Sequence, residues 1–195
     1  MDVMEVFTEL MTNASKTKKL GAKVGASNDQ IMQLTKLGFP ALLAALDKNA
    51  NSKEGAASLY QALEQHQDDP VEDPDNFLEN VDTEDGEKML SHIFLNKKEA
   101  VEKTLSKQTG LNMSQVASLL QRFGPLLLAL LAKKKKESNV NLDGLSGLTS
   151  ALTNTYSQSN EGGGIMGVMT QLLDSDKDGS IIDDIGTLFG KFFSK

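Results

Sequence analysis

The 195-residue chain contains no cysteine and no tryptophan, and aromatic residues make up only 5% of it. Without cysteine it has no disulfide, no thiol catalysis and no cysteine-ligated metal site. Arg122 is the only arginine, which excludes a clamp for phosphates or carboxylates built from several arginines. The net charge of −7 argues against nucleic acid as a partner, because phosphate backbones are bound by basic surfaces.

Histidine is nearly as scarce, since His66 and His92 are the only two in the chain. We expect His92, which stands beside Ile93 and Phe94, to pack a helix against its neighbours. Two isolated histidines support neither a Ser/His/Asp triad nor a histidine-ligated metal site. The sequence therefore predicts a protein that is not an enzyme.

Targeting and membrane segments are also missing. The N-terminal residues have neither the basic nor the apolar region of a signal peptide. The longest apolar run, Leu126 to Ala132, is much shorter than the ~20 residues that span a bilayer. We therefore expect a cytoplasmic protein without a membrane span, with export by a signal-independent machinery as the alternative.

The residues that are present favour helices. The apolar residues are mostly Leu, Ala, Ile and Met, of which Ala and the unbranched Leu and Met lose little freedom in a helix. No stretch of strand length alternates between apolar and polar residues. We predict an all-α fold, a multi-helical array with no sheet.

A duplication organises this array. One constant offset of 85 positions aligns two segments without a gap. The aligned pairs include Gly25 with Gly110, Gln30 with Gln115, Leu34 with Leu119 and Pro40 with Pro125. Identity at this density predicts two copies of one supersecondary unit.

Each copy has a helix-capping pair and, ten residues after its glutamine, a proline. Ser27 and Asn112 are N-cap residues, and a glutamine three residues later matches the capping box. Proline is well tolerated at the first position of a helix, so each proline is predicted to open a second helix. The unit is then a helical hairpin, and the alternative is one long helix kinked at the proline.

An acidic stretch separates the two copies. Residues 64–87 contain no lysine or arginine but include Pro70 and Pro74, which is typical of an exposed loop; a cation-binding tract is the alternative. Two short helices are expected after it, from Lys88 onward. The predicted organisation is a first helical repeat at residues 1–66, an acidic linker at 67–87, a second helical repeat at 88–156, and a glycine-rich spacer with an Asp-rich loop and a helix at 157–195.

The segment from Asp174 to Ile185 resembles an EF-hand calcium loop. Carboxylates at positions 1, 3 and 5 converge on one ion in such loops, a glycine at position 6 allows the sharp turn, and the carbonyl of position 7 points inward. Position 12 is Ile185, where a bidentate glutamate is expected. We therefore predict a shortened Ca²⁺ site with the ligands Asp174, Asp176, Asp178, Ser180 and Asp184.

The same residues have a simpler interpretation. Ser180 would be the N-cap of the last helix and Asp183 would complete a capping box, with the acidic residues favoured by the helix dipole.

Gly162, Gly164 and Gly167 match a dinucleotide-binding fingerprint, but a polar segment precedes them instead of a strand, so they indicate a linker. Lys133–Lys136 are predicted to be a solvated helix end, with an anionic-membrane patch as the alternative.

Several motifs together resemble the bacterial family known as domain of unknown function 937, for which we expect a relation to the YidB-like proteins. The resemblance runs from about residue 25 to the C-terminus and implies an all-helical fold and a bacterial source, but no activity. Leu95 stands where the family pattern has glycine, so the turn there is expected to differ. The motifs are Gly55–Leu59, Leu63–His66, Asp85–Lys88, Ser91–Phe94, Gly110–Asn112 and Leu172–Asp184.

These observations favour a non-enzymatic structural or interaction protein with a protein partner and a calcium-stabilised C-terminal loop. An effector or cargo of a bacterial secretion or envelope system is one form of this function. The alternatives are a divalent-metal-dependent hydrolase that uses the aspartate cluster and, less favoured, a nucleic-acid-binding regulator. The apolar stripe from Ile181 to Phe192 is expected to pack on the protein's own core, with docking to a partner as the minority option.

Overall fold

The computed structural model describes residues 2–159 and 162–174, and within these ranges all regular structure is helical. This confirms the predicted all-α fold. The 3-10 turn η1 (Leu95–Lys97) joins α6 to α7, and η2 (Leu142–Gly144) precedes α9. The helices are α1 (Val3–Thr12), α2 (Ala14–Val24), α3 (Asn28–Ala50), α4 (Lys53–Gln65), α5 (Pro74–Asn80), α6 (Thr83–Phe94), α7 (Lys98–Thr109), α8 (Met113–Glu137), α9 (Leu145–Gln158) and α10 (Gly162–Asp174).

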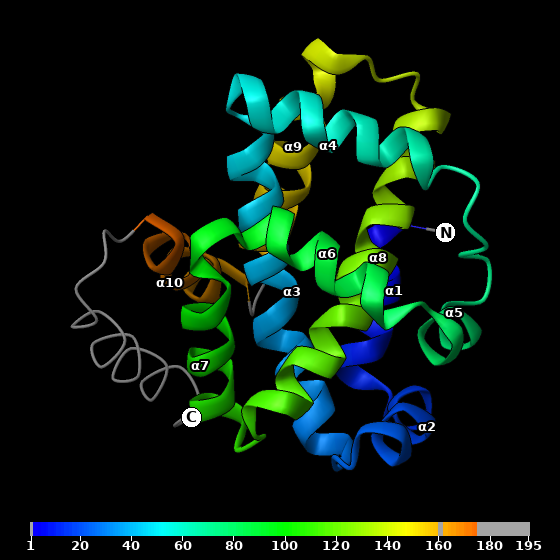
Figure 1. Cartoon of the computed structure of the whole chain (residues 1–195), viewed down its shortest axis with the longest axis vertical. Helices are drawn as coiled ribbons and strands as arrows, with labels where there is room; N and C mark the ends of the chain where they lie inside the picture. The colour runs from blue at the N-terminus through cyan, green and yellow to red at the C-terminus, as the bar shows by residue number, and fades with distance from the viewer. Residues whose placement is uncertain (1, 160–161, 175–195) are drawn as a thin grey trace.

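Two long helices, α3 and α8, form the centre of the molecule, and the other helices surround them (Figure 1). Helices α1, α2, α4, α9 and α10 pack on α3, while α4, α5, α6 and α7 pack on α8. Every residue from Phe39 to Leu46 in α3 and from Phe123 to Ala132 in α8 is buried. The core is therefore made by the segments of α3 and α8 that the duplication relates.

Both predicted capping boxes are confirmed, with the members Ser27 and Gln30 at α3 and Asn112 and Gln115 at α8. Each glutamine also reaches the other copy. Gln30 Nε2 donates to the Gly110 carbonyl at 3.4 Å, and Gln115 Nε2 donates to the Gly25 carbonyl at 2.6 Å. Because one contact repeats the other with the roles exchanged, the two copies are related by an approximate two-fold axis. We call this pair of contacts the glutamine clasp.

The predicted break at each proline is wrong. Pro40 lies inside α3 and Pro125 lies inside α8, so the single-helix alternative describes each copy. A break here would have placed two new helix ends, each with unpaired N–H or C=O groups, among fully buried residues. A proline inside a helix costs about 3 kcal/mol, which is less than leaving several buried backbone groups without partners.

The carbonyl four residues before each proline loses its usual N–H partner, and each of the two meets a different neighbour. The carbonyl of Lys36 accepts a hydrogen bond from the Tyr156 hydroxyl at 3.3 Å. The carbonyl of Gln121 lies against Gly86 of α6, where an added Cβ would be only 2.0 Å from the oxygen. Glycine at this position therefore lets the backbones of α6 and α8 come into direct contact.

Aromatic rings join α3 to two of the helices that pack around it. Phe7 of α1 stacks on Phe39 of α3 with ring centroids 4.2 Å apart. Tyr156 of α9 meets the edge of the same Phe39 ring at 5.3 Å. At the offset of 85, the counterpart of Phe39 is Gly124, which carries no ring. The two central helices, α3 and α8, thus differ in how they contact the helices around them.

The acidic stretch is not the exposed loop that its composition predicted. Residues Pro74–Asn80 form α5, in which Pro74 occupies the first turn after the N-cap Asp73, and α6 begins at Thr83. Val71 and Leu78 are buried, with 1% and 2% of their surfaces exposed. The two apolar side chains hold the segment against α8 and its neighbours, so the stretch is part of the fold.

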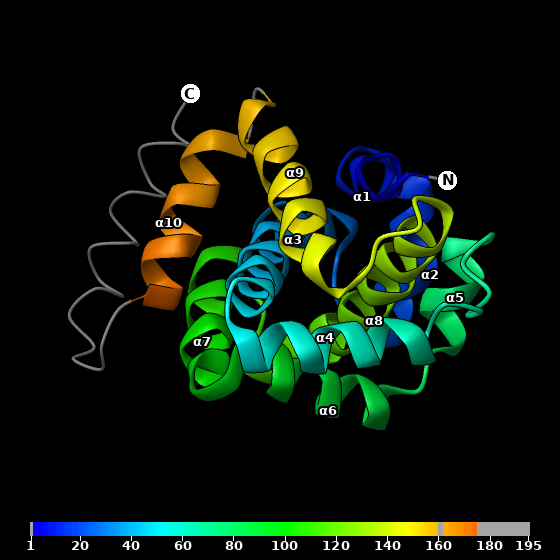
Figure 2. The ribbon, with the colours of Figure 1, turned by 90° about the horizontal axis from the view of Figure 1, so that it is seen from above.

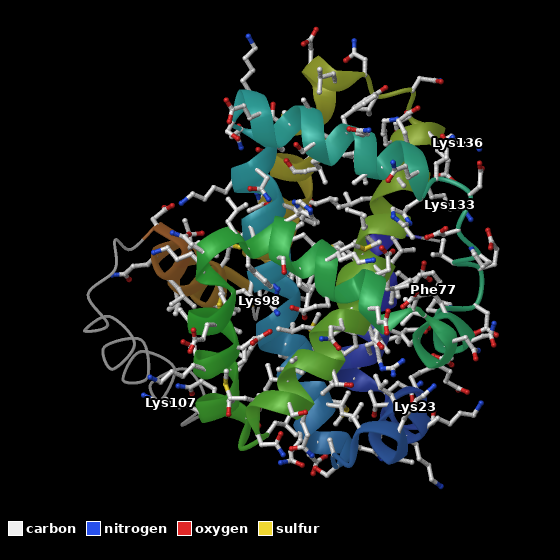
Figure 3. All side chains as sticks on the ribbon, in the orientation of Figure 1. Lys23, Phe77, Lys98, Lys107, Lys133 and Lys136 are labelled. Atoms are coloured by element: carbon white, nitrogen blue, oxygen red, sulfur yellow. The ribbon has the colours of Figure 1, made fainter. Side chains whose placement is uncertain are left out.

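The acidic side chains of this stretch pair with lysines from two other parts of the chain. Lys16 and Lys19 of α2 reach α5, and the lysines at the end of α8 reach the segment before α5; Figure 3 shows Lys133 and Lys136 beside it. The predicted solvated helix end is therefore wrong for Lys135, whose side chain is 6% exposed, whereas the side chain of Lys136 is 56% exposed. The pairs are Lys16–Asp75, Lys19–Glu79, Lys133–Glu72, Lys135–Glu64 and Lys136–Asp68.

Helix α8 is the one helix in the described ranges that is long and apolar enough to cross a membrane, but 78% of its apolar window is buried inside the protein. It also carries Arg122, of which only 8% is exposed. Arg122 Nη1 donates to the Leu78 carbonyl at 2.9 Å, near the C-terminal end of α5, and burial lowers the pKa of the guanidinium. These features are those of a core helix.

The last described helices differ slightly from the predicted spacer. Residues 157 and 158, assigned to the spacer in the predicted organisation, are the last residues of α9. The helix expected from Ile165 to Leu173 is present as α10. The predicted C-terminal helix after Ser180 lies outside the described residues.

Candidate functional site

Asp174 is the one predicted calcium ligand within the described residues. It ends α10, and its Oδ1 atom lies 2.5 Å from the Nζ atom of Lys48 in α3. Lys48 also donates to the Leu173 carbonyl at 3.0 Å, so its ammonium group bonds both a backbone carbonyl and a carboxylate at the C-terminal end of α10. A calcium ion at this carboxylate would have to compete with Lys48. The other predicted ligands, Asp176, Asp178, Ser180 and Asp184, lie outside the described residues.

The two histidines lie on the surface. The prediction that His92 packs a helix is wrong, because its side chain is exposed on α6. His66 ends α4, and its Nδ1 atom lies 2.9 Å from Asp69 Oδ2. Although far apart in the sequence, both histidines line the same hollow, which the sequence gave no reason to expect.

This hollow is a groove of about 650 Å³ between α4 and α6. The two helices run in opposite directions side by side, as Figures 1 and 2 show from two directions. Leu46 of α3 and Leu128 of α8 lie at its base. The apolar wall residues are Leu59 and Ala62 from α4 and Met89 and Ile93 from α6. We call this feature the α4–α6 groove.

The rim of the α4–α6 groove is polar and carries three charged side chains. Glu54 belongs to α4, while Asp85 and Lys88 belong to α6. None of the three takes part in an ion pair within the described part of the chain. An apolar base with a polar rim is the usual composition of a site that binds a ligand or a peptide.

Leu95 lies at the end of the groove in an unusual conformation. Its φ of 51° and ψ of −128° belong to a region that glycine adopts easily and leucine does not. Its side chain is 63% exposed. That the turn here differs from the family pattern stays a prediction.

One cluster of carboxylates resembles an acid–base pair. Glu87 bonds Lys98 and Gln121, which lowers the pKa of its carboxyl group. Burial raises the pKa of Glu102, whose Oε1 atom lies 3.7 Å from Lys98 Nζ. Carboxylates with pKa values pushed apart are typical of some active sites. Here, however, the groups pair with one another and none of them lines the groove, so we interpret the cluster as structural.

Metal binding finds no further support in the described ranges. No group of three or more histidine or acidic side chains there could hold an ion. Five of the acidic residues from Glu64 to Glu79 pair with lysines, as described above, and Asp69 pairs with His66. The α4–α6 groove is therefore the strongest candidate for a functional site.

A family model described as "Bacterial protein of unknown function (DUF937)" matches residues 9–134 and 137–193. No curated protein and no solved structure matches the chain. The family match confirms the resemblance seen in the motifs, while the relation to the YidB-like proteins stays a prediction. With nearly its whole length matched, the chain belongs to the bacterial family DUF937.

Proposed function

We propose that this protein is a non-enzymatic interaction protein that holds a segment of a protein partner in the α4–α6 groove. The observation that carries the proposal is the apolar interior of the groove, with Leu46 and Leu128 at its base and Leu59 in its wall, beneath a rim of polar side chains. Grooves between helices are common seats for peptide segments, because side chains of the partner can fill the apolar base while its polar face stays in water.

The charged groups of the groove support binding over catalysis. His66 is already paired with Asp69, and neither Glu54 nor Asp85 contacts a histidine. A general base needs a hydrogen-bonded partner group or a substrate within about 3 Å. The rim groups stand apart along the groove, which suits contacts to a long ligand.

Photocrosslinking in the bacterial host tests the proposal. A photoreactive amino acid is placed at Ser58 or Gln61, both exposed on the groove, and at Thr8 or Lys103 as controls on α1 and α7. We expect one protein, identified by mass spectrometry, to crosslink at the groove positions and not at the controls. Equal crosslinking at all four positions, or none in the groove, would contradict the proposed site.

The finer form of the proposal includes calcium and a location. We propose that Ca²⁺ stabilises the segment that begins at Asp174, and that the partner belongs to an envelope or secretion system of which this chain is an effector or cargo. The spacing of the aspartates supports the calcium site, and the bacterial family supports the setting. Lys48 is the natural competitor of the ion at Asp174.

Thermal unfolding with excess calcium and with chelator tests this part. A ligand of the folded state present at a hundredfold excess over its Kd adds about 2.7 kcal/mol of stability. We expect a calcium-dependent rise in Tm that is absent in Asp176→Ala and larger in Lys48→Met, in which the competing ammonium is gone. An unchanged rise in Asp176→Ala would exclude the site, and leave the segment as a helix cap.

A further inference from the structure

We infer that the occupant of the α4–α6 groove is an amphipathic helix of a partner protein, about three turns long, with a basic residue at each end. The inference rests on the proposed function and adds the shape and charge of the partner. Its argument uses the spacing of the lining residues, the unpaired charges on the rim, the conformation of Leu95 and the difference between the two halves of the molecule.

The spacing of the lining residues fits a helix. On α4 the rim and wall residues recur every three or four positions, and α6 repeats this pattern on the opposite side. Five residues of α6 and the following Leu95 line the groove. Asp85 and Leu95 are ten positions apart, so with a rise of about 1.5 Å per residue the groove is about 15 Å long. Two antiparallel helices with a gap between them offer a third helix the ridges and grooves that helices use to pack. The lining residues of the two walls are Glu54, Ser58, Gln61 and Gln65 on α4 and Asp85, Lys88 and His92 on α6.

The charges indicate basic residues on the partner. Glu54 lies near the start of α4, and Asp85 near the start of α6. Because the two helices are antiparallel (Figure 1), these carboxylates lie toward opposite ends of the groove, and Lys88 follows Asp85 by one turn of α6. Acidic groups elsewhere in this chain are often paired with lysines, whereas these two have no cationic partner in the described ranges. A helix with lysine or arginine at both ends would supply the missing cations.

Leu95 marks one end of the groove as a contact for apolar groups. Holding a leucine at a φ of 51° costs on the order of 1 to 3 kcal/mol, and glycine would avoid the cost. The side chain is also left 63% exposed beside other apolar lining residues. Exposed apolar groups next to an apolar groove are typical of interaction sites. A partner side chain packed on Leu95 would bury this leucine, whose positive φ strains the backbone.

The helices that pack around α3 are joined by aromatic rings, unlike the two walls of the α4–α6 groove. The helices that correspond to α4 and α6 are α9 and α1, and they are joined through Tyr156, Phe39 and Phe7. In the described ranges no aromatic pair joins α4 to α6. The position that corresponds to Phe39 is Gly124. Leu90 and Ile93 of α6 pack against Gly124, and among the described residues no phenylalanine or tyrosine lines the α4–α6 groove.

A set of synthetic peptides tests the inference by fluorescence anisotropy. The probe is a stapled helical peptide of about 11 residues with leucines along one face and lysine at both ends. The first control peptide has glutamate at both ends, and the second has the same composition with the leucine stripe scrambled. We expect the lysine-ended peptide to bind about tenfold more tightly than the glutamate-ended one, and the scrambled peptide not to bind.

Protein variants complete the test. Glu54→Lys combined with Asp85→Lys should reverse the preference, and the milder Glu54→Gln with Asp85→Asn should remove it if the first variant fails to fold. Leu95→Gly should raise Tm and weaken the lysine-ended peptide about tenfold. Asn139→Gly is the matched control, since Asn139 also has a positive φ, of 50°, but does not line the groove; it should leave binding unchanged.

Several outcomes would overturn the inference. Equal affinity of the lysine-ended and glutamate-ended peptides contradicts the charge, and equal affinity of the scrambled peptide contradicts the helix. A dimer that Leu95→Gly dissociates would assign the groove to a second copy of this chain, and binding of phosphatidylglycerol vesicles in place of peptide would assign it to a membrane. If no peptide binds but Ser58 and Gln61 still crosslink to one protein, the proposed function stands and only this account of its partner is wrong.

Discussion

Gly86 offers the sharpest test of how the two central helices hold their neighbours. An alanine Cβ at this position would lie 2.0 Å from the carbonyl oxygen of Gln121 and 2.9 Å from its carbonyl carbon. Both atoms are backbone atoms of α8, so no flexible side chain can move aside. The Gly86→Ala substitution should therefore push α6 away from α8.

The expected loss of stability follows from this geometry. An ordinary contact begins near 3.4 Å, so the Cβ and the oxygen must separate by more than 1 Å. Moving α6 loosens the packing of Leu90, which is fully buried. Overpacking of this kind costs about 3 kcal/mol, and alanine returns about 1 kcal/mol through its higher helix propensity. The net loss should be about 2 kcal/mol of unfolding free energy.

Urea unfolding followed by far-UV circular dichroism measures this change. With a slope of about 2 kcal/mol per molar urea, the midpoint should fall by about 1 M while the slope stays constant. Gly167→Ala is the matched control, because Gly167 lies inside α10 with no atom within 4 Å of the added Cβ. The control should gain up to about 1 kcal/mol.

Opposite signs for the two alanine variants would support the close contact between α6 and α8. If Gly86→Ala were as stable as the wild type, or gained stability as the control does, the helices could not approach each other as described. The explanation of how the carbonyl freed by Pro125 is accommodated would then fail as well.

Three further comparisons test other contacts. Gln115→Ala should lose about 0.5 kcal/mol more than Gln30→Ala in urea unfolding, because the hydrogen bond of Gln115 to the other copy is shorter, at 2.6 Å against 3.4 Å; equal losses would contradict the unequal clasp. Lys135→Ala should lower the unfolding free energy by about 1 to 2 kcal/mol, because Lys135 is 5% exposed and its ammonium group lies 4.0 Å from the centroid of the Tyr60 ring. Lys136→Ala removes an exposed ion pair and should cost less than about 0.5 kcal/mol. Thermal unfolding that ranks the two variants the other way would contradict this. Burial raises the pKa of Glu102, so ionisation of its carboxyl group at neutral pH lowers the stability of the fold. Glu102→Gln should therefore be more stable than the wild type at pH 7, and this advantage should shrink as the pH falls and be gone below about 4.3. An advantage that grows toward low pH would contradict the raised pKa.

Local signals in the sequence predicted the helices and their beginnings well. Each capping box involves residues three positions apart, so Ser27 with Gln30 is visible without knowledge of the fold. The proline at position 40 was misleading for the opposite reason. Whether a helix continues through a proline depends on what surrounds it, and here the surroundings are buried on all sides.

The groove and the acidic segment could not be predicted in the same way. Glu72 pairs with Lys133, and the two are 61 positions apart. Composition alone therefore predicted a solvated segment, although five carboxylates from Glu64 to Glu79 pair with lysines elsewhere in the protein. The walls of the α4–α6 groove come from helices that the acidic segment separates, and only their packing shows that His66 and His92 belong to one site.

The glutamine clasp has a consequence for how the molecule loses its structure. Its hydrogen bonds join residues 80 and 90 positions apart, and each completes the end of a helix in the other repeat. When one repeat unfolds, the other loses a partner at the turn before its own central helix. We therefore expect the two repeats to unfold as one cooperative unit, although the duplication built the chain from two similar pieces.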